Sequence, residues 1–266
     1  MNKIIVVANQ KGGVAKTSTV RNLSYSLAEL GKRVLTVDLD PQSNLTIGFG
    51  IIPKKAKHTT GTLITRMLTE EGLPEKNEYI HTVGKVDVLP ASRALTIADV
   101  NMLISPGSNK YLSKLLEPLR DDYDYILIDT NPSLGALTIN ALTASGSVII
   151  PAQADIYSLQ GIENLEETIK AVKKYCNPNL KIEGILLTRY NPRTILSREV
   201  SEMAEKLAEK LETKLFKAKI RDAVAVKEAQ ISQESLFEYA PKSNVTQDYE
   251  SFINEFLGKE RNRKNG

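Results

Sequence analysis

The stretch from residue 3 to residue 40, KIIVVANQKGGVAKTSTVRNLSYSLAELGKRVLTVDLD, decides the fold of this chain. An apolar run at residues 4–8 is followed by a loop of small residues that holds two lysines. Apolar side chains then recur at helical spacing over residues 16–30, and a second apolar run at residues 34–37 leads into two aspartates. A strand, a loop, a helix and a strand in this order predict a parallel, right-handed βαβ unit.

The loop has the chemistry of a phosphate-binding site. Gly12 and Gly13 lack a Cβ atom, so the backbone can adopt positive φ and turn its N–H groups toward an anion. The helix that starts near Lys16 adds a partial positive charge, and the Lys16 ammonium adds a full one. Thr17 offers a hydroxyl where a phosphate-bound Mg²⁺ needs an oxygen ligand. We expect nucleotide phosphates to contact the loop residues Gly12, Gly13, Val14, Ala15, Lys16, Thr17 and Ser18.

The loop departs from the standard pattern G-x-x-x-x-G-K-[ST] at both of its glycines. Gln10 stands at the first position and Ala15 at the last. Lys-Gly-Gly turns also close ordinary loops, so the pattern alone leaves phosphate binding and a plain turn about equally open. The methyl group of Ala15 is compatible with a phosphate loop if the φ angle of this residue is negative.

Three aspartates close two of the expected strands. Asp38 and Asp40 follow the strand at residues 34–37, and strand alternation places both on one side. Asp129 closes the apolar run at residues 125–129. Such carboxylates either cap the next helix or serve a ligand, and ligands of open α/β sheets lie at the carboxyl ends of the strands. We therefore place Asp40 and Asp129 at the site.

Apolar patterns along the rest of the chain predict one α/β domain over residues 1–258, with a mostly parallel central β-sheet and helices on both faces. Further strands are expected at residues 79–83, 85–89, 147–150 and 182–187. Further helices are expected at residues 62–68, 97–104, 111–119, 162–175, 195–211 and 245–257. The tail, residues 259–266, is rich in lysine and arginine, and we expect it to be flexible.

Composition excludes several classes of protein and site. Cys176 is the only cysteine, which rules out an internal disulfide and a cysteine metal cage. His58 and His81 are too few and too isolated for a metal site. No apolar run approaches the roughly 20 residues of a membrane span, and the N-terminal apolar stretch is too short for a signal peptide. We expect a cytoplasmic protein whose mild net charge of +3 confines any nucleic-acid binding to a local basic patch.

Five motifs occur in order along the chain: KGGVAKTS, DLDPQ, ILIDTNPSLG, PAQAD followed by LQG, and LLTRYNPRT. Together they resemble the ParA/Soj-type partition ATPases, members of the ParA/MinD group of P-loop NTPases with a deviant Walker A motif. The resemblance covers nearly the whole chain and implies an ATPase that binds ATP and Mg²⁺ and turns over slowly without a partner. The chain departs from the family motifs at Ala15, which replaces a glycine, and at Asn131, which replaces a proline.

The resemblance also implies roles for individual residues. Lys11 matches the signature lysine that reaches the nucleotide of the other subunit in an ATP-bound homodimer. Lys16 neutralises charge on the β- and γ-phosphates, and Asp40 lies near the attacking water. The implied catalytic residues are thus Lys11, Lys16 and Asp40, and the implied metal ligands are Thr17, Asp40 and Asp129. Arg189 and Asn191 match a loop that lies beside the base and the ribose.

The densest basic stretch outside the tail runs from Lys210 to Lys227. It contains six Lys and Arg residues and only two acidic residues, Glu212 and Asp222. It is either a solvated outer strand and helix end or a surface for DNA phosphates, whose contacts are independent of sequence and weakened by salt. ParA-type relatives bind nonspecific DNA here as ATP-bound dimers and release it on hydrolysis, which a centromere-binding ParB-type partner stimulates. The resemblance thus implies association with the nucleoid through Lys214, Lys217, Lys219, Arg221 and Lys227.

Other functions share parts of this pattern. A MinD-like positioning ATPase ends in an amphipathic membrane helix, and residues 245–257 carry one apolar stripe. Glu250 and Glu255 do not suit an anionic membrane, so we expect this stripe to pack in the core, with no stable membrane association. A ligase similar to dethiobiotin synthetase is disfavoured by the motifs after Asp129, and an iron-protein-like reductase by the lack of cluster cysteines. A regulatory ATPase slowed by Ala15 is the remaining alternative.

Overall fold

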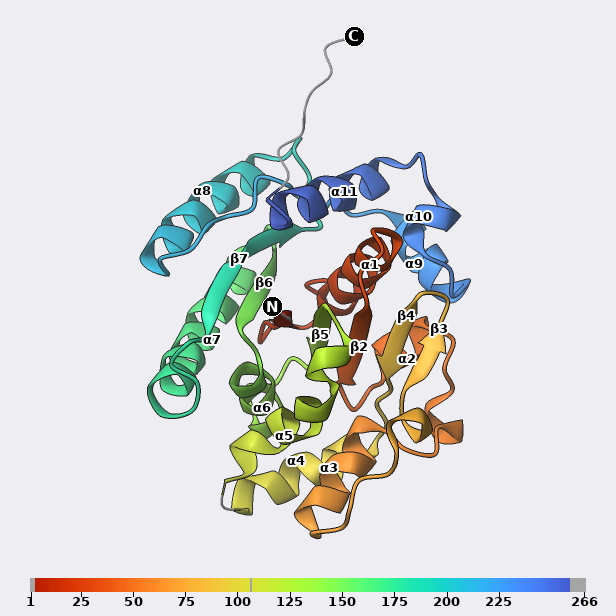
Figure 1. The fold of residues 1–266 in the computed structure, drawn as a ribbon. Helices are drawn as coiled ribbons and strands as arrows, with labels where there is room; N and C mark the ends of the chain where they lie inside the picture. The colour runs from red at the N-terminus through yellow and green to blue at the C-terminus, as the bar shows by residue number, and fades with distance from the viewer. Residues whose placement is uncertain (1–2, 106, 259–266) are drawn as a thin grey trace.

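A mostly parallel sheet forms the centre of the computed structural model, which describes residues 3–105 and 107–258. Its strands follow the order β3-β4-β2-β5-β1-β6-β7 (Figure 1), and β3 alone runs antiparallel to its neighbour β4. The strands are β1 (Lys3–Val7), β2 (Val34–Leu39), β3 (His81–Val83), β4 (Val86–Leu89), β5 (Tyr125–Thr130), β6 (Ser147–Gln153) and β7 (Lys181–Thr188). The predicted fold class is confirmed.

Helices of the described residues match the ranges predicted from the sequence, and four further helices, at residues 44–48, 136–144, 224–231 and 236–239, were not predicted. The helices are α1 (Lys16–Glu29), α2 (Asn44–Gly48), α3 (Thr60–Leu68), α4 (Ala94–Ile104), α5 (Tyr111–Leu116), α6 (Ala136–Ala144), α7 (Ile156–Tyr175), α8 (Ile195–Lys210), α9 (Val224–Ile231), α10 (Leu236–Tyr239) and α11 (Asn244–Phe256). Short 3₁₀ helices are η1 (Pro53–Lys55), η2 (Lys76–Glu78), η3 (Ser108–Lys110) and η4 (Glu117–Asp122). Helix α7 begins earlier than the predicted residue 162 because the Asp155 side chain caps it at the Ser158 N–H.

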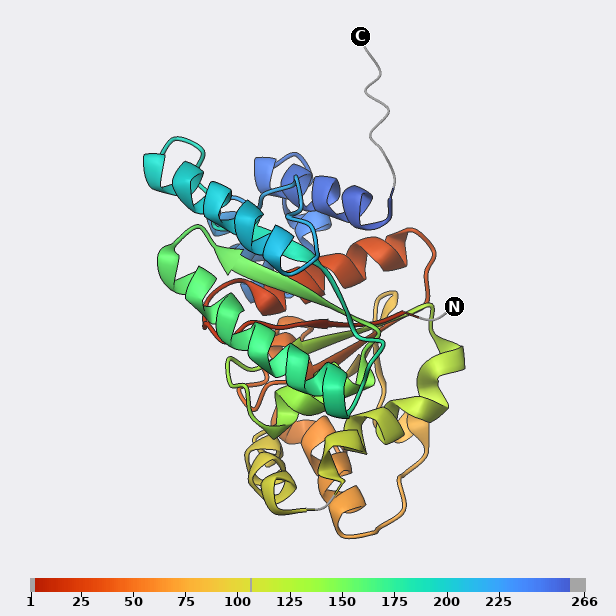
Figure 2. The same cartoon turned by 90° about the vertical axis from the view of Figure 1, so that its left-hand side faces the viewer.

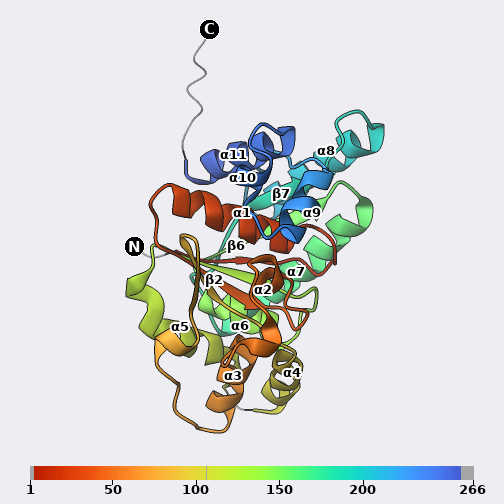
Figure 3. The same ribbon diagram turned by 90° about the vertical axis from the view of Figure 1, so that its right-hand side faces the viewer.

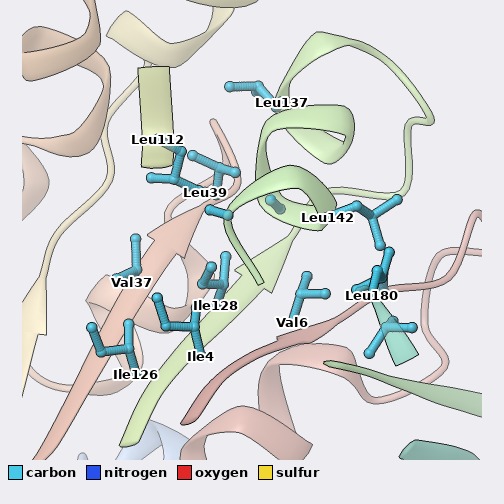
Figure 4. Close-up of a cluster of buried hydrophobic side chains, with 14 of the residues drawn as sticks. Ile4, Val6, Val37, Leu39, Leu112, Ile126, Ile128, Leu137, Leu142 and Leu180 are labelled. Carbon is cyan, nitrogen blue, oxygen red and sulfur yellow. The ribbon is translucent and has the colours of Figure 1, made fainter. Parts of the chain in front are cut away.

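Two hydrophobic layers enclose the sheet, and alternate residues of each strand belong to different layers. Ile4 and Val6 pack with helices α3 to α7, whereas Ile5 and Val7 pack with α1 and α11. Figures 2 and 3 show the same division, with α1 and α9 to α11 on one side of the sheet and α3 to α6 on the other. Figure 4 shows β1, β2 and β5 side chains of the first layer beneath leucines from α5 and α6. These layers hold the carboxyl ends of the strands in fixed positions.

The apolar stripe of α11 is part of the core. Tyr249, Phe252, Ile253 and Phe256 are all buried in the layer that contains α1. The Phe252 ring meets the Phe216 ring edge to face, with 5.0 Å between centroids. The expectation of core packing for this stripe is confirmed. Within residues 3–105 and 107–258, the longest apolar helices fall short of what a bilayer crossing requires; the predicted flexible tail, residues 259–266, lies outside the described residues.

Candidate active site

A cavity of about 750 Å³ lies at the carboxyl ends of β1, β2, β5 and β7. It joins residues singled out in the sequence that are far apart in the chain: Gly12, Gly13, Ala15, Lys16, Thr17, Ser18, Asp40, Arg189, Arg221 and Lys227. Lys11, Val14, Asp129 and Asn191 are not among its described lining residues. Helices α2 and α9 supply further walls, including Ile47 and Gln230, which sequence reasoning missed. Their contribution is a product of tertiary packing, for which the sequence carries no local signal.

The phosphate loop turns from β1 into α1 through two residues with positive φ. Gly13 has a φ of 77° and Ala15 a φ of 65°. The condition of a negative φ at Ala15 is therefore not met. The residue occupies the N-cap position of α1, where its carbonyl accepts the Thr19 N–H at 2.9 Å. A left-handed conformation costs a residue with a Cβ atom about 1–2 kcal/mol, so Ala15 is strained where a glycine is not.

Side chains at the ends of neighbouring strands hold the loop in this shape. The Thr188 hydroxyl donates to the Val14 carbonyl at 3.1 Å, and the Gln153 amide donates to the Gly13 carbonyl at 3.1 Å. The Asn9 side chain bridges β1 to β6, since it donates to the Pro151 carbonyl at 2.8 Å and accepts the Lys11 N–H at 3.0 Å. These contacts fix the loop before any ligand arrives, which is the condition for strong electrostatic stabilisation of a bound anion.

The Lys16 side chain lies buried at the site and contacts the phosphate loop. Its side chain is buried, and its ammonium donates to the Lys11 carbonyl at 3.0 Å. Burial lowers the pKa of Lys16, while the carboxylates of Asp129 and Asp40 oppose this shift. A lysine at the base of a helix N-terminus, in a cavity lined by glycines, is suited to a phosphate.

Asp129 and Thr17 lie together near Lys16, with Thr17 lining the cavity and Asp129 buried outside its lining. The Thr17 hydroxyl donates to Asp129 Oδ2 at 2.7 Å, whereas Asp129 Oδ1 is buried without a hydrogen-bond partner among the described residues. Burial raises the pKa of Asp129 well above its ordinary value, and the nearby Asp38 raises it further. A buried carboxylate oxygen that lacks a partner, next to a hydroxyl, fits a Mg²⁺ ion, which prefers hard oxygen ligands. The residues present therefore fit the predicted metal.

Asp38 and Asp40 have different surroundings in the structure. Asp38 is fully buried and accepts the Thr46 N–H at 2.9 Å and the Thr46 hydroxyl at 2.6 Å. It thus caps α2, and burial raises its pKa to about 6. Asp40 lines the cavity, with Oδ1 accepting the Gln42 N–H at 2.8 Å.

Lys11 contacts a carboxylate of its own chain. Its ammonium lies 2.6 Å from both oxygens of Asp155, the N-cap residue of α7, and 5.9 Å from the centre of the Tyr157 ring. Burial alone would raise the pKa of Asp155, but its bonds to Lys11 and Ser158 outweigh this, so the net pKa is lowered. In the single chain, the Lys11 ammonium therefore forms an ion pair with Asp155 of the same chain.

The residues expected at the base and the DNA occupy two places. Arg189 pairs with Asp222 at 3.2 Å, and Arg221 pairs with Asp248 at 2.6 Å, both on the rim of the cavity. Lys227 also lines the cavity. Asn191 is exposed outside the lining, and its Oδ1 accepts the Arg193 N–H.

The remaining predicted DNA contacts lie on a segment between α8 and α9. Lys214 and Lys217 are exposed, with the Lys214 ammonium 4.6 Å from the centre of the Phe216 ring. Lys219 is half-buried, because its ammonium donates to the Ser201 hydroxyl at 2.7 Å and lies over the Tyr190 ring. Lys214, Lys217 and Lys219 are called the basic segment below. The five predicted contacts therefore divide between this segment and the cavity.

The chain is similar in sequence to a known family and to the Soj proteins of two organisms. A family model described as an AAA domain matches residues 2–182. The sporulation initiation inhibitor protein Soj of Bacillus subtilis is 40% identical, over 94% of this chain and 96% of Soj. The chromosome-partitioning ATPase Soj of Thermus thermophilus is 37% identical, over 96% of this chain and 95% of that protein.

A solved structure is similar along nearly its whole length. The cobyrinic acid a,c-diamide synthase of Mycobacterium smegmatis, with a bound ATP analog and magnesium, superposes with a TM-score of 0.81. It is 32% identical in sequence, and the match covers 97% of this chain and 95% of that one. The likeness extends to a protein that holds both a nucleotide and the metal for which the cavity has suitable groups.

Proposed function

Because this chain belongs to the ParA/Soj family of partition ATPases, we propose that it segregates DNA through a cycle of ATP binding and hydrolysis. It is an ATPase with ATP and Mg²⁺ as cofactors. The observation that carries the proposal is that Lys16 and Thr17 line the cavity at the phosphate loop, and that the Thr17 hydroxyl donates to the buried Asp129. This arrangement suits the β- and γ-phosphates of a nucleotide together with a metal ion.

Each polar group of the site has a distinct task in hydrolysis. The N–H groups of the loop and the Lys16 ammonium bind the phosphates, and Thr17 and Asp129 hold Mg²⁺. Bound Mg²⁺ supplies neutralisation of the charge that develops on the phosphate oxygens. Asp40 is fixed through one carboxylate oxygen by the Gln42 N–H, which leaves the other to orient a water molecule. The chain thus contributes position and charge, the main requirements of phosphoryl transfer.

The ATP-bound form is a homodimer in this proposal. Large apolar side chains are exposed on elements that surround the cavity at the same edge of the sheet: Ile47, Tyr157, Ile195, Val224 and Ile231. A second copy placed over this edge would bury them and cover the nucleotide. Lys11 would then leave Asp155 and contact the nucleotide of the other copy, which couples dimerisation to ATP.

In this proposal the dimer binds nonspecific DNA, and the basic segment is the surface that contacts it. Lys214 and Lys217 are exposed, and among the described residues neither forms an ion pair with a carboxylate. Free cations of this kind bind phosphates independently of sequence. We place the protein on the nucleoid in its ATP-bound state, with a ParB-type partner that stimulates hydrolysis and releases it.

A second candidate is synthesis of a small molecule, favoured by the 32% identity to the cobyrinic acid a,c-diamide synthase. That function requires an organic acceptor beside the γ-phosphate, and the described residues at that end of the cavity are Asp40, Gln42 and Pro132. A product assay with candidate carboxylic acids and an amine donor separates the two functions. An amide product formed at the rate of ATP consumption would replace the partition proposal.

DNA binding in the presence of ADP, ATP and a nonhydrolysable analogue tests the proposal. We expect binding with ATP and its analogue, little binding with ADP, and a steep fall in affinity as salt is raised. A Lys214→Ala, Lys217→Ala double variant should reduce the slope of log K against log salt by about 1–2. The matched control is Lys173→Ala, Lys174→Ala on the exposed end of α7, which should leave the slope unchanged. Equal binding in all nucleotide states would contradict the proposal.

A further inference from the structure

A buried arginine lies behind the cavity. Arg21, in the second turn of α1, is only 2% exposed, yet among the described residues no carboxylate forms an ion pair with it. Its Nη2 atom instead donates to the carbonyls of Glu234, at 2.6 Å, and Ala229, at 3.4 Å. Its Nε atom is buried without a partner. Burial of an unpaired charge is costly, so this side chain needs a role that offsets the cost.

The Ala229 carbonyl lies in the last turn of α9, and the Glu234 carbonyl lies just after it. Helix α9 forms one wall of the cavity. Val226, Lys227, Gln230 and Ile231 of α9 line the cavity, but Ala229 is its one buried described residue. The helix closes with the Glu234 N–H on the Ala229 carbonyl at 3.0 Å. A guanidinium at this end adds a second donor to the Ala229 carbonyl, donates to the Glu234 carbonyl just after the helix, and complements the helix dipole. Arg21 therefore helps to fix the end of a helix in which one described residue is buried.

The same side chain contacts α2, which walls the cavity beside α9. The guanidinium carbon lies 5.3 Å from the centre of the Tyr25 ring and 5.9 Å from that of Phe49, the residue that ends α2. A Cβ atom on Gly48 would lie 3.5 Å from Arg21 Cδ, so the backbone of α2 packs directly on the arginine stem. Gly48 and Ile47 of α2 line the cavity. One side chain thus contacts both walls.

We propose that Arg21 is a positioning residue for nucleotide binding, which fixes α2 and α9 to the helix that carries the phosphate loop. The inference rests on the proposed ATPase function. Arg21 is not a lining residue of the cavity and acts through the two helices. A second link between α9 and α1, from the Gln230 amide to the Ser18 hydroxyl, spans 3.4 Å, the same length as the bond from Arg21 to the Ala229 carbonyl. The bond from Arg21 to the Glu234 carbonyl, just after α9, is shorter than both at 2.6 Å, so Arg21 contributes to the position of α9.

The test compares Arg21→Met and Arg21→Lys with the wild-type chain. Methionine fills similar space without donating, and lysine keeps the charge but loses the planar fork. The matched control, Arg33→Met, removes an arginine that also donates to a carbonyl, that of Asp121, on the exposed connection after α1. Three quantities are measured: the Kd of a nonhydrolysable ATP analogue, kcat at saturating ATP, and amide hydrogen exchange over residues 224–234 without nucleotide.

For Arg21→Met we expect the Kd to rise about tenfold, the effect of losing one charge-assisted hydrogen bond. The value of kcat should stay within about twofold, because Lys16 and Asp40 are untouched. Exchange over residues 224–234 should accelerate about tenfold, while α11 stays protected. Arg21→Lys should show about a third of each effect, and Arg33→Met none. If Arg21→Met does not fold, Arg21→Lys carries the same comparison.

An unchanged Kd, or a raised Kd with unchanged exchange over residues 224–234, would overturn the inference. A fall in kcat with no change in Kd would also overturn it, because that result places Arg21 in the chemical step. If the wild-type chain itself binds no nucleotide, the proposed function fails instead. The exchange measurement on nucleotide-free protein then still decides whether Arg21 fixes α9.

Discussion

The phosphate loop and the α9 wall face each other across one cavity and are held in different ways. The loop is held to strand ends by hydrogen bonds to its carbonyls, of which the Thr188 bond is buried and the Gln153 bond is exposed. The wall has one buried described residue, Ala229, packs Val226 against the core, and accepts a hydrogen bond from Arg21 of α1. Its neighbours on the rim, Arg189 and Arg221, form ion pairs with about half of each arginine side chain exposed.

This difference has a consequence for how a ligand is bound. Bonds in the core are preorganised and little screened, so each contributes strongly to holding an anion. Exposed ion pairs contribute about 0–1 kcal/mol each and are weakened by salt. We therefore propose that phosphate recognition is fixed in this protein, whereas the wall and the rim adjust if a second chain or a base is bound. Substitutions on the loop side should then change ligand binding strongly, and substitutions on the rim should change it less.

Lys16→Ala should have the largest effect. It removes the ammonium that lines the cavity near Asp129, so affinity for ATP should fall at least about 100-fold. Calorimetric titration with a nonhydrolysable analogue measures the loss. Lys173→Ala, on an exposed part of α7, is the control and should bind as wild type. Retention of normal ATP binding by Lys16→Ala would show that the cavity is not the nucleotide site.

Asp129→Asn should reduce hydrolysis by about 10–100-fold, because a metal ligand loses its charge. The nucleotide-free variant should also be more thermostable at neutral pH than wild type. Burial raises the pKa of Asp129 well above its ordinary value, so the folded chain binds this proton more tightly than the unfolded chain. Wild-type stability therefore falls as pH rises from about 4 through the raised pKa, and the variant lacks that contribution.

Thermal melts of both proteins between pH 5 and pH 8, without Mg²⁺, measure this difference. The gap in Tm should widen as the pH rises. A gap that narrows with rising pH would mean that the Asp129 carboxylate is stabilised in the folded chain, against the burial that the structure describes.

Asp155→Asn should act on the rim side and have a moderate effect. Asparagine keeps the cap of α7 but removes the charge that holds Lys11 in cis. Dimerisation with ATP should then occur at about threefold lower protein concentration, since this half-buried ion pair should contribute about 1 kcal/mol or less. Mass photometry across a dilution series measures the shift. Weaker dimerisation in the variant would mean that Asp155 supports the dimer instead of restraining Lys11.

Ala15→Gly should have the smallest effect. Relief of the left-handed strain is worth about 1 kcal/mol, and the greater freedom of glycine in the unfolded chain offsets roughly half of it. The Tm should rise by about 1–2 °C. Glu70→Gly, at another left-handed position with φ of 57°, is the control and lies outside the cavity.

Comparison of ATP turnover in these two variants tests whether Ala15 slows the enzyme. Faster turnover in Ala15→Gly, with no change in Glu70→Gly, would support the slow regulatory alternative. Equal rates would mean that Ala15 is neutral for catalysis and that its strain affects stability alone.

The two sides of the cavity also differ in how far the sequence reveals them. Lys16, Thr17 and Asp40 could be placed beforehand, because a glycine loop before a helix and a carboxylate after a strand are local patterns. The bond from Arg21 to Glu234 joins positions 213 residues apart, and no periodicity connects them. The partner of Lys11, 144 residues away, was missed for the same reason. The φ angle of Ala15 depends on how the loop enters α1, which residue types alone do not determine.

The central claim is that ATP in this cavity converts a monomer into a dimer. Sedimentation velocity of the wild-type chain with Mg²⁺ and either ADP or a nonhydrolysable ATP analogue tests it most directly. We predict a species of about 29 kDa with ADP, the mass of the single chain, and one of twice that mass with the analogue. Lys11→Ala should stay monomeric in both. The same mass with ADP and with the analogue would contradict the account.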